Sequence, residues 1–475
     1  MTTWLGGILE LTSKVRYGLT SRGSPLYRFI PYDKRFSPLA VGSSTRDFTT
    51  NVHVIIEPSK QGKPGQMNHG NLVKTLGPPT PVTETEVLLL TYAYDNTKEF
   101  RKEVILSTPP PPEKSERYEV KDGFTFHIDP SGCMDVDDAF TFMKTPTGWR
   151  VMIHIADVDY WIGLGSEVDI AAKQRATTFY CSNGFALAPM LPSAYSENEA
   201  SLLPGSQKPA LSLVFEWVPG KPVGDVSWMT TRIQTQKSFS YESVMGEVHN
   251  DYISALRQLA AQLGADINDS HTWVEELMIF YNEHAGILLQ KNGRGILRRH
   301  SAPTEEKLRQ IALLEEKGFE HLCMEAAEYC LATEQSYHYG LRKNVYAYAS
   351  SPLRRYADLI NQRILKDILR GHTSIPNPSQ EDINHLNIRQ KQSKKFSRDV
   401  FFMRMVYEHK TGGVEGFVIE RASDYTKVWI PEWKRVIKVR EQLDPTAKWF
   451  HITWYADMAL PGWKQRVIYS AKPLH

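Results

Sequence analysis

The chain has 475 residues, of which 41% are hydrophobic, so it is long enough to form more than one domain with a sizeable core. Its 56 lysine and arginine residues nearly balance 54 aspartate and glutamate residues and leave a formal net charge of +2. This balance excludes a protein that attracts nucleic acid through a globally positive field, so any such contact must use local basic patches. We expect two to four domains.

The cysteines and the N-terminal residues indicate in which kind of cellular compartment the protein is expected. Four cysteines contain no Cys-x-x-Cys pair, which argues against structural zinc and against a disulfide framework; they are Cys133, Cys181, Cys323 and Cys330. The first residues lack the basic start and the apolar run of a signal peptide, and no apolar stretch approaches the roughly 20 residues that span a bilayer. These features predict a soluble, intracellular protein without membrane contact.

The N-terminal region predicts a small β-barrel. Short apolar runs at residues 52–56 and 87–90 are typical of strands, and glycine, proline and asparagine clusters separate such runs. Residues 107–114 contain four consecutive prolines, which favour a stiff, extended connector because they cannot continue a helix or a central strand. We therefore place the end of a first domain, residues 1–107, at this connector.

The segment from His127 to Asp138 concentrates negative charge. It carries four aspartates within ten residues, namely Asp129, Asp135, Asp137 and Asp138. Like carboxylates held close together repel one another unless a cation lies among them, and hard oxygen ligands select Mg²⁺ or Mn²⁺. Apolar runs at residues 124–128 and 139–143 predict buried strands on either side, so these carboxylates are positioned. The pattern favours a catalytic site for a divalent metal.

The residues alone allow two other interpretations of the aspartates. Most aspartate-rich segments are solvated turns, and some are calcium loops. An EF-hand loop that began at Asp135 would need glycine at its sixth position and glutamate at its twelfth, where this chain has Phe140 and Pro146. A calcium loop of that kind is therefore excluded, and the flanking strands argue against a solvated turn.

The second half of the chain predicts first helices and then strands. Residues 240–400 show helical periodicity, for example at 305–322 and 352–369, whereas residues 414–420 and 427–431 have the pattern of strands. Two basic sets lie in the helical region, at Arg294, Arg298 and Arg299, and at Lys391, Lys394, Lys395, Arg398 and Arg404. The second set recurs at helical spacing and predicts a cationic face, either for an RNA backbone or simply for solvent.

Four phrases occur in an order that resembles the catalytic RNB domain of the RNase II family, which includes RNase R and Dis3. They are the acidic segment 127–139, then Ile153-His-Ile-Ala-Asp-Val158, Ala188-Pro-Met-Leu-Pro192 and Ser351-Pro-Leu-Arg-Arg-Tyr-Ala-Asp358. The resemblance covers residues 118 to about 400. It implies processive, Mg²⁺-dependent hydrolysis of single-stranded RNA from the 3′ end, with release of nucleoside 5′-monophosphates.

The resemblance also implies an architecture. The fold class is multidomain, with an α/β (α+β) RNB catalytic domain at residues 118–405 between β-barrel OB-fold RNA-binding domains at residues 1–107 and 410–475. The phrase Phe29-Ile-Pro-Tyr-Asp-Lys-Arg35 is similar to the second of the two cold-shock-like OB folds that precede RNB domains. The N-terminal region is too short for both, so we expect one. We expect a monomer whose partner is single-stranded RNA.

The family pattern assigns roles to individual residues. Asp129, Asp135, Asp137 and Asp138 coincide with the acidic positions that hold Mg²⁺, with Mn²⁺ as an alternative, and Asp137 and Arg354 are the predicted catalytic residues. A planar guanidinium can contact two phosphate oxygens at once, although an isolated arginine at a helix start more often forms a surface salt bridge. Asp358, four residues after Arg354, is expected to orient Arg354 or Arg355.

The family pattern also predicts residues that contact RNA. Tyr180 and Tyr241 coincide with aromatic residues that stack on the 3′-terminal bases, although most tyrosines belong to the core. Arg298, Lys394 and Lys395 complete the predicted RNA contacts. His154 alternates with apolar strand residues and is expected to be a core histidine.

Two departures from the family are visible. Residues 326–333 lack an acid and an asparagine that many members carry there, and Lys208 replaces a common arginine. Neither departure affects the four aspartates, so we expect an altered rate or affinity and not lost chemistry. The alternative is a non-catalytic RNA-binding scaffold with a degenerate RNB body, which the intact aspartates disfavour.

Overall fold

The computed structural model describes residues 3–59, 67–96, 117–181, 184–247, 249–305, 308–309, 325–433, 435–441, 443–457, 460 and 466–474. The chain divides into two compact units. The terminal unit consists of Met1–Lys102, Phe179–Ala188 and Gln392–His475, and the central unit consists of Glu103–Thr178 and Pro189–Lys391. The proline-rich connector at 107–114 lies outside the described residues, so the predicted domain boundaries stay a prediction.

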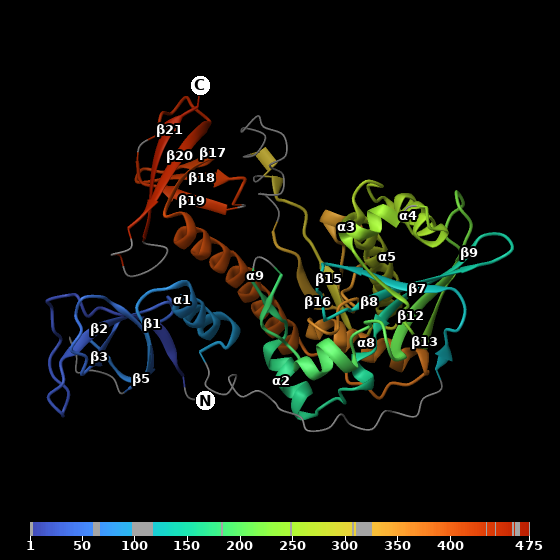
Figure 1. Cartoon of the computed structure of the whole chain (residues 1–475), viewed down its shortest axis with the longest axis horizontal. Coiled ribbons are helices and arrows are strands. Elements are labelled where there is room, and N and C mark those ends of the chain that lie inside the picture. Colours follow the sequence, from blue (N-terminus) through green and yellow to red (C-terminus); the bar gives the residue numbers. More distant parts are fainter. Residues whose placement is uncertain are drawn as a thin grey trace. The chain divides into compact units, whose positions relative to one another are not determined.

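The terminal unit begins with a closed five-stranded barrel, drawn in blue in Figure 1, whose strands follow the order β1-β2-β3-β5-β4. The strands are β1 (Leu5–Leu9), β2 (Leu26–Pro31), β3 (Leu39–Gly42), β4 (Val52–Pro58) and β5 (His69–Gly77). Fully buried side chains such as Leu5, Phe29 and Val54 fill the barrel. The expected small barrel and the strand expected at 52–56 are confirmed.

The strand expected at residues 87–90 is wrong, because this segment is helical. Helix α1 (Pro81–Leu88) continues into a π-helical turn (Leu89–Ala93). Thr80 caps the helix in a reciprocal capping box with Thr83, and Pro81 occupies the first turn. An apolar run of four residues has no measurable period, so the cap upstream of the run decides the structure.

The C-terminal part of the terminal unit is a five-stranded sheet in the order β19-β18-β17-β20-β21, and all its pairs are antiparallel. The strands are β17 (Thr411–Arg421), β18 (Thr426–Ile430), β19 (Arg435–Val439), β20 (Trp449–Ala456) and β21 (Val467–Pro473). They confirm the strands expected at 414–420 and 427–431. Helix α9 (Gln380–His409) leads into this sheet, and a short pair, β10 (Phe179–Tyr180) and β11 (Ala186–Ala188), belongs to the same unit.

A buried ion pair joins distant segments of the terminal unit. Arg466, next to β21, donates a hydrogen bond to Glu84 of α1 over 2.9 Å, and neither side chain is exposed. Tyr407 of α9 donates its hydroxyl to Glu84 over 2.7 Å and accepts from Arg466 over 2.8 Å, and the hydroxyl of Tyr32 also contacts Glu84. Helices α1 and α9 and the C-terminal sheet therefore share one set of polar contacts.

The central unit is built on a seven-stranded sheet in the order β14-β7-β8-β9-β12-β13-β6. The strands are β6 (Tyr118–Glu119), β7 (Phe124–Asp129), β8 (Asp138–Lys144), β9 (Trp149–Ala156), β12 (Lys208–Trp217), β13 (Val226–Ile233) and β14 (Lys237–Ser240). Strands β7 and β8 confirm the buried strands expected on either side of the aspartates. Figure 1 shows this sheet in cyan and green among the helices of the unit.

Helices of the central unit form two apolar clusters with the sheet. In one cluster, Phe140, Ile153 and Leu211 pack with α4 (Asp251–Leu263) and α5 (Ser270–Lys291). In the other, Ala139, Ala156 and Ala210 pack with residues of α2 (Glu167–Arg175) and α8 (Tyr356–Leu369). The short helix α3 (Tyr241–Val244) follows β14 directly.

The expected helical region, residues 240–400, is confirmed in part. Helix α8 occupies most of the helix expected at 352–369, whereas nearly all of the helix expected at 305–322 lies outside the described residues. An antiparallel pair, β15 (Ile296–Arg299) and β16 (Glu328–Leu331), interrupts the helices. Within the described ranges, no helix combines the length and the apolar character needed to cross a bilayer.

A chain of buried side-chain hydrogen bonds crosses five strands of the central sheet. It runs through Thr125, Thr141, His154, Ser212 and Thr231, with oxygen and nitrogen atoms 2.6 to 2.8 Å apart. Burial lowers the pKa of His154 to about 3, so the imidazole is neutral and donates from one ring nitrogen while it accepts at the other. The expected core histidine is confirmed.

We predict that His154 makes the central unit lose stability in mild acid. The unfolded chain binds a proton on this histidine near pH 6.5 whereas the folded chain does not, so stability falls as the pH drops from 6.5 towards 3. The share of one histidine is about 1.4 kcal/mol between pH 7.5 and 5.5. Urea unfolding at both pH values should show this share lost in His154→Gln. The same substitution at the exposed His249 should leave the pH dependence unchanged; equal behaviour of the two variants would contradict the prediction.

Candidate active site

The four predicted metal ligands lie at one edge of the central sheet. Asp129 ends β7 and Asp138 begins β8, and the loop between these antiparallel neighbours carries Asp135 and Asp137. Strand β14 runs parallel to β7 with Ser240 opposite Asp129, so Tyr241 emerges at the same edge. The strand pairing therefore collects residues from two segments of the chain, about a hundred residues apart, around the acidic loop.

Asp137 is buried and its carboxylate is held at both oxygens. The backbone N–H of Leu353 donates to one oxygen over 3.0 Å, and Nε of Arg354 donates to the other over 2.9 Å. Burial raises the pKa of Asp137 to about 7, although Arg354 and the Leu353 amide oppose this rise. The structure thus brings together the two predicted catalytic residues, which are 217 positions apart in the sequence.

The residues before α8 point their two guanidinium groups in different directions. Arg354 also contacts the hydroxyl of Ser351 over 3.0 Å, and 43% of its side chain is exposed. Arg355 donates to Asp358 over 2.8 Å and lies 3.9 Å from the ring centre of Tyr348. The predicted orienting role of Asp358 is therefore realised with Arg355, away from the carboxylate of Asp137.

Asp138 lies deeper than its charged neighbours can compensate, because burial and two other carboxylates outweigh the attraction of Arg354. One carboxylate oxygen of Asp138 is buried without a hydrogen-bond partner among the described residues. Burial, followed by the charges of Asp129 and Asp137, holds the pKa of Asp138 well above its usual range. Asp129 contacts Nδ1 of His127 over 2.8 Å, and the thiol of Cys133 contacts Asp135 over 3.4 Å.

The donor chemistry of this edge fits a hard divalent cation. The unpartnered oxygen of Asp138 and the mutual repulsion of three nearby carboxylates would both be relieved by a cation, and oxygen donors select Mg²⁺ or Mn²⁺. A ready-made geometry is missing, however: in the part of the chain that the structure describes, no three histidine, cysteine or acidic side chains are grouped closely enough to hold a metal ion. The charge therefore fits a cation, whereas the spacing of the side chains is not that of an assembled site.

The predicted RNA contacts occupy different environments. Tyr241 stacks on His271 with ring centres 3.7 Å apart, and the pKa of its hydroxyl is raised by burial and by the charges of Asp138 and Asp129. Tyr241 therefore lies beside the acidic loop. Tyr180 belongs to β10 in the terminal unit, where its carbonyl accepts from Ser397 over 2.6 Å.

The basic residues that were predicted to contact RNA also lie in different units and differ in their exposure. Lys394 and Lys395 are exposed residues of α9 in the terminal unit. Arg298 is only 1% exposed and lies between the rings of Tyr329 and Tyr348. The Cζ atom of its guanidinium is 4.6 Å from each ring centre. It also donates to Gln390 and to the carbonyl of Ala327. These contacts make Arg298 a buried packing residue and leave it almost no surface for a phosphate.

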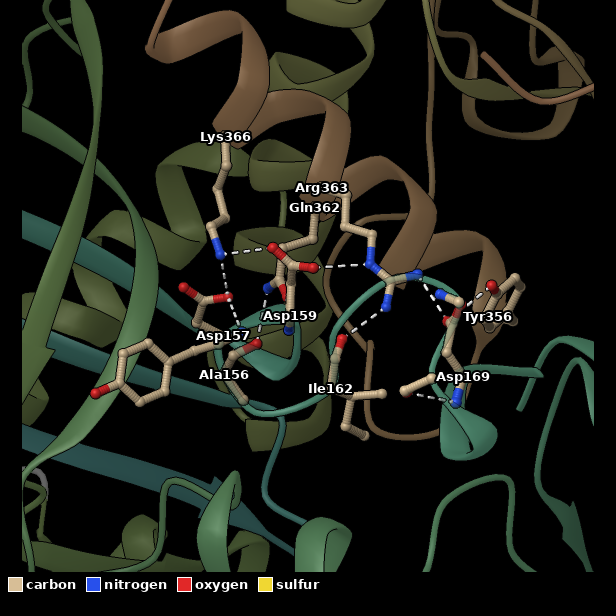
Figure 2. Close-up of polar contacts among 12 residues, drawn as sticks. Ala156, Asp157, Asp159, Ile162, Asp169, Tyr356, Gln362, Arg363 and Lys366 are labelled. Atoms are coloured by element: carbon tan, nitrogen blue, oxygen red, sulfur yellow. Dashed lines mark hydrogen bonds and ion pairs between the residues drawn. The ribbon is translucent and has the colours of Figure 1, made fainter. Parts of the chain in front are cut away.

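A buried charge network, shown in Figure 2, ties helix α8 to the segment that follows β9. Its members come from α8 and from residues 157–169. Lys366 contacts Asp157 over 2.9 Å and Asp159 over 2.8 Å, and Arg363 contacts Asp159 and Asp169 over 2.8 Å each. The attraction of these carboxylates raises the pKa of both cations against the effect of burial. These ion pairs hold the helix that Arg354 precedes.

Sequence reasoning missed the backbone groups and the network that support the site. The amide of Leu353 carries no signal because every non-proline residue has one. Gln362, Arg363 and Lys366 have the side chains of a solvated helix face, yet all three are buried. The sequence of α8 gave no signal for this burial, because the carboxylates that pair with its cations lie about two hundred residues away.

Comparison with protein families identifies the central unit. The model of the RNB domain matches residues 117–263 and 246–371, which together make up more than half of the chain. Among curated proteins, the chain is similar to the Exosome complex exonuclease RRP44 homolog A of Arabidopsis thaliana, with 22% identity over 509 residues that cover 87% of this chain and 54% of the relative. The chain spans about half the length of the curated RRP44 relatives that it matches.

Solved structures share the fold of the whole chain. RNase R of Mycoplasma genitalium, in complex with ribose-methylated single-stranded RNA, has a TM-score of 0.77 at 16% identity over 99% of this chain and 89% of its own. Yeast Ssd1, a pseudonuclease, has a TM-score of 0.73 at 18% identity over 96% of this chain and 67% of its own. The predicted fold class, an α/β RNB body with OB folds, is confirmed, and the two likenesses show that both nucleases and a pseudonuclease have it.

We predict that Asp138→Asn stabilises the protein when no metal is added. The substitution replaces a buried carboxyl group, whose ionisation is opposed by burial and by two other carboxylates, with a neutral amide; this should raise the free energy of unfolding by on the order of 1 kcal/mol and the melting temperature by about 2–4 °C. Added Mg²⁺ should raise the melting temperature of the parent and do so much less in the variant. Calorimetry with and without Mg²⁺ measures both effects, and Asp122→Asn, at an exposed position, is the control. A destabilised variant with a full Mg²⁺ response would contradict the metal assignment.

Proposed function

Because the chain belongs to the RNB domain family, we propose that it is a 3′-to-5′ exoribonuclease that hydrolyses single-stranded RNA processively and releases nucleoside 5′-monophosphates. The observation that carries the proposal is the pairing of Asp137 with Arg354 at the sheet edge where the other three aspartates lie. This pairing joins a carboxylate for a metal to a guanidinium for a phosphate. The name of the Arabidopsis relative, an exonuclease, is consistent with it.

The aspartates at this edge would hold Mg²⁺, or Mn²⁺, as the cofactor. Asp129, Asp135, Asp137 and Asp138 supply the oxygen ligands, and the unpartnered oxygen of Asp138 is the most direct support for a cation among them. When bound, such a cation supplies an activated water and shields the negative charge of the phosphoryl group. Everything else that the reaction needs must come from the side chains and from the amides that hold them.

Arg354 is proposed to respond to the charge of the reacting phosphate. Asp137 and Ser351 fix its guanidinium, while nearly half of the side chain remains exposed to an incoming substrate. A planar guanidinium that is held in advance strengthens its contact as negative charge develops on the phosphate, and this costs no reorganisation. Arg354 is therefore proposed to stabilise the transition state.

RNA binding is proposed to combine base stacking with phosphate contacts. Tyr241, beside the acidic loop, offers a ring for the terminal base, and Tyr180 is proposed to stack on a second base. Lys394 and Lys395 are exposed and offer charges to the backbone of a longer strand. Such contacts recognise no particular base, which suits an enzyme that degrades any sequence.

A second function, RNA binding without hydrolysis, has two observations in its favour. No described group of three side chains is arranged to hold a metal, and the fold is shared with Ssd1, a pseudonuclease. In that case, Asp137 and Arg354 would be a structural ion pair and the acidic loop would remain without a cation.

A single assay separates the two functions. The protein should shorten a 5′-labelled linear RNA from its 3′ end in Mg²⁺, and EDTA or Asp137→Asn should abolish this while RNA binding persists, because only the charge of one ligand changes.

Circular RNA and DNA of the same sequence should stay intact, since the site needs a free 3′ end and contacts to 2′-hydroxyls. Binding without any hydrolysis would establish the scaffold function. Cleavage of circular RNA would indicate an endonuclease, and digestion of DNA would remove only the sugar specificity.

Arg354→Lys should lower turnover much more than affinity. Lysine keeps the positive charge but loses the planar fork that contacts Asp137 and a phosphate together, so kcat should fall by about a hundredfold while the Kd for RNA changes by about twofold or less. Single-turnover kinetics and fluorescence anisotropy measure the two effects. If the Kd rose while turnover stayed the same, Arg354 would be a positioning contact for the RNA and not a transition-state contact.

A further inference from the structure

Gln362, in the middle of α8, is bonded to the residue that holds the backbone of Asp137. Its side-chain amide donates to the carbonyl of Ala156 over 2.7 Å. The N–H of Ala156 in turn donates to the carbonyl of Asp137 over 2.8 Å. Figure 2 shows the side chain of Gln362 directed from α8 towards Ala156. One residue at the end of β9 therefore joins α8 to the acidic loop.

Helix α8 reaches Asp137 by a second route, through the residues that precede its first turn. The amide of Leu353 and Nε of Arg354 hold the two carboxylate oxygens of Asp137, as described above. The backbone of Asp137 is thus tied to the middle of α8 through Ala156, and its side chain is tied to the beginning of α8. A shift of the helix would move both attachments together.

The charge network prevents such a shift. Lys366 lies one turn after Gln362 and contacts Asp157, the residue next to Ala156. A slide of one residue along the helix axis is about 1.5 Å with a rotation of about 100°, which would break the contacts of both side chains. Gln362 is itself fully buried and also accepts from the N–H of Asp159 over 3.3 Å, so the donor and acceptor ends of its amide are both engaged.

We propose that Gln362 is a positioning residue for the nuclease reaction: through Ala156, it fixes the main chain of Asp137 so that the carboxylate of Asp137 and the guanidinium of Arg354 keep one relative geometry. The proposal rests on the proposed exonuclease function. Gln362 touches neither the reacting atoms nor the RNA in this assignment. Its loss should therefore lower kcat through the geometry of the pair and leave substrate binding unchanged.

The adjacent residue Asn361 supplies a matched control. It is an equally buried amide of α8, but its contacts are the N–H and carbonyl of Ile296 and the carbonyl of Tyr348, all at 2.8 Å. Gln362→Met and Asn361→Leu each replace an amide by an apolar group of similar size. We expect both variants to melt at a lower temperature, but only Gln362→Met to lose kcat, by about tenfold or more, with KM and the Kd for RNA within about twofold of the parent.

A second measurement does not depend on activity. If Gln362 and Arg354 hold the same residue, the shifts in urea midpoint caused by Gln362→Met and Arg354→Met should be non-additive, whereas those of Asn361→Leu and Arg354→Met should add. If Gln362→Met does not fold, Gln362→Glu replaces it, because it keeps the length of the side chain and loses the amide donor. Absence of hydrolysis by the parent would refute the proposed function, and the urea cycle would still decide the linkage.

Two results would overturn the proposal. One is an equal loss of kcat in the Gln362 and Asn361 variants, which would mean that any damage to α8 lowers activity. The other is additive stability changes for Gln362→Met and Arg354→Met, which would mean that the two residues do not act on a common element.

Discussion

The central unit depends on the requirement that every charge buried on helix α8 finds a partner. Burying an ion costs several kcal/mol unless a countercharge and hydrogen bonds replace the lost water. Arg363 and Lys366 are nearly fully buried and meet this requirement only where Asp157, Asp159 and Asp169 converge. A helix held by apolar contacts alone could settle in more than one register, whereas these pairings permit one. The position of Arg354, immediately before the helix, follows from that register.

At the acidic loop, carboxylates lie beside one another and raise the pKa of Asp138. Asp157, Asp159 and Asp169 are paired with Arg363 and Lys366, whereas one buried oxygen of Asp138, like one of Asp358 in α8, has no hydrogen-bond partner among the described residues. Uncompensated groups of this kind are uncommon in folded proteins and gather where a ligand or a reaction uses them.

The sequence predicted those features that are local in the chain. The four aspartates, their flanking strands and the Arg354 phrase are each contained in a short segment with a clear pattern. The strand predicted at 87–90 was wrong because four apolar residues are too few to show a period, and the cap at Thr80 starts a helix that includes this segment. Arg298 was predicted to contact RNA, but it is buried between two tyrosine rings, and these come from the distant positions 329 and 348. The partners of Gln362 and Lys366 are about two hundred residues away, so only folding reveals them.

The buried ion pair between Glu84 and Arg466 limits which substitutions the chain can accept during evolution. A substitution that removes either charge leaves the other buried without a countercharge and lowers the stability of the fold by about 3 to 5 kcal/mol. Replacing both residues together by apolar residues can leave the stability almost unchanged. Tyr407 adds a third position to this constraint. The segments around residues 84, 407 and 466 are thus expected to vary together among related sequences, and exchange of one end of the chain between relatives should succeed only when the other end is exchanged with it.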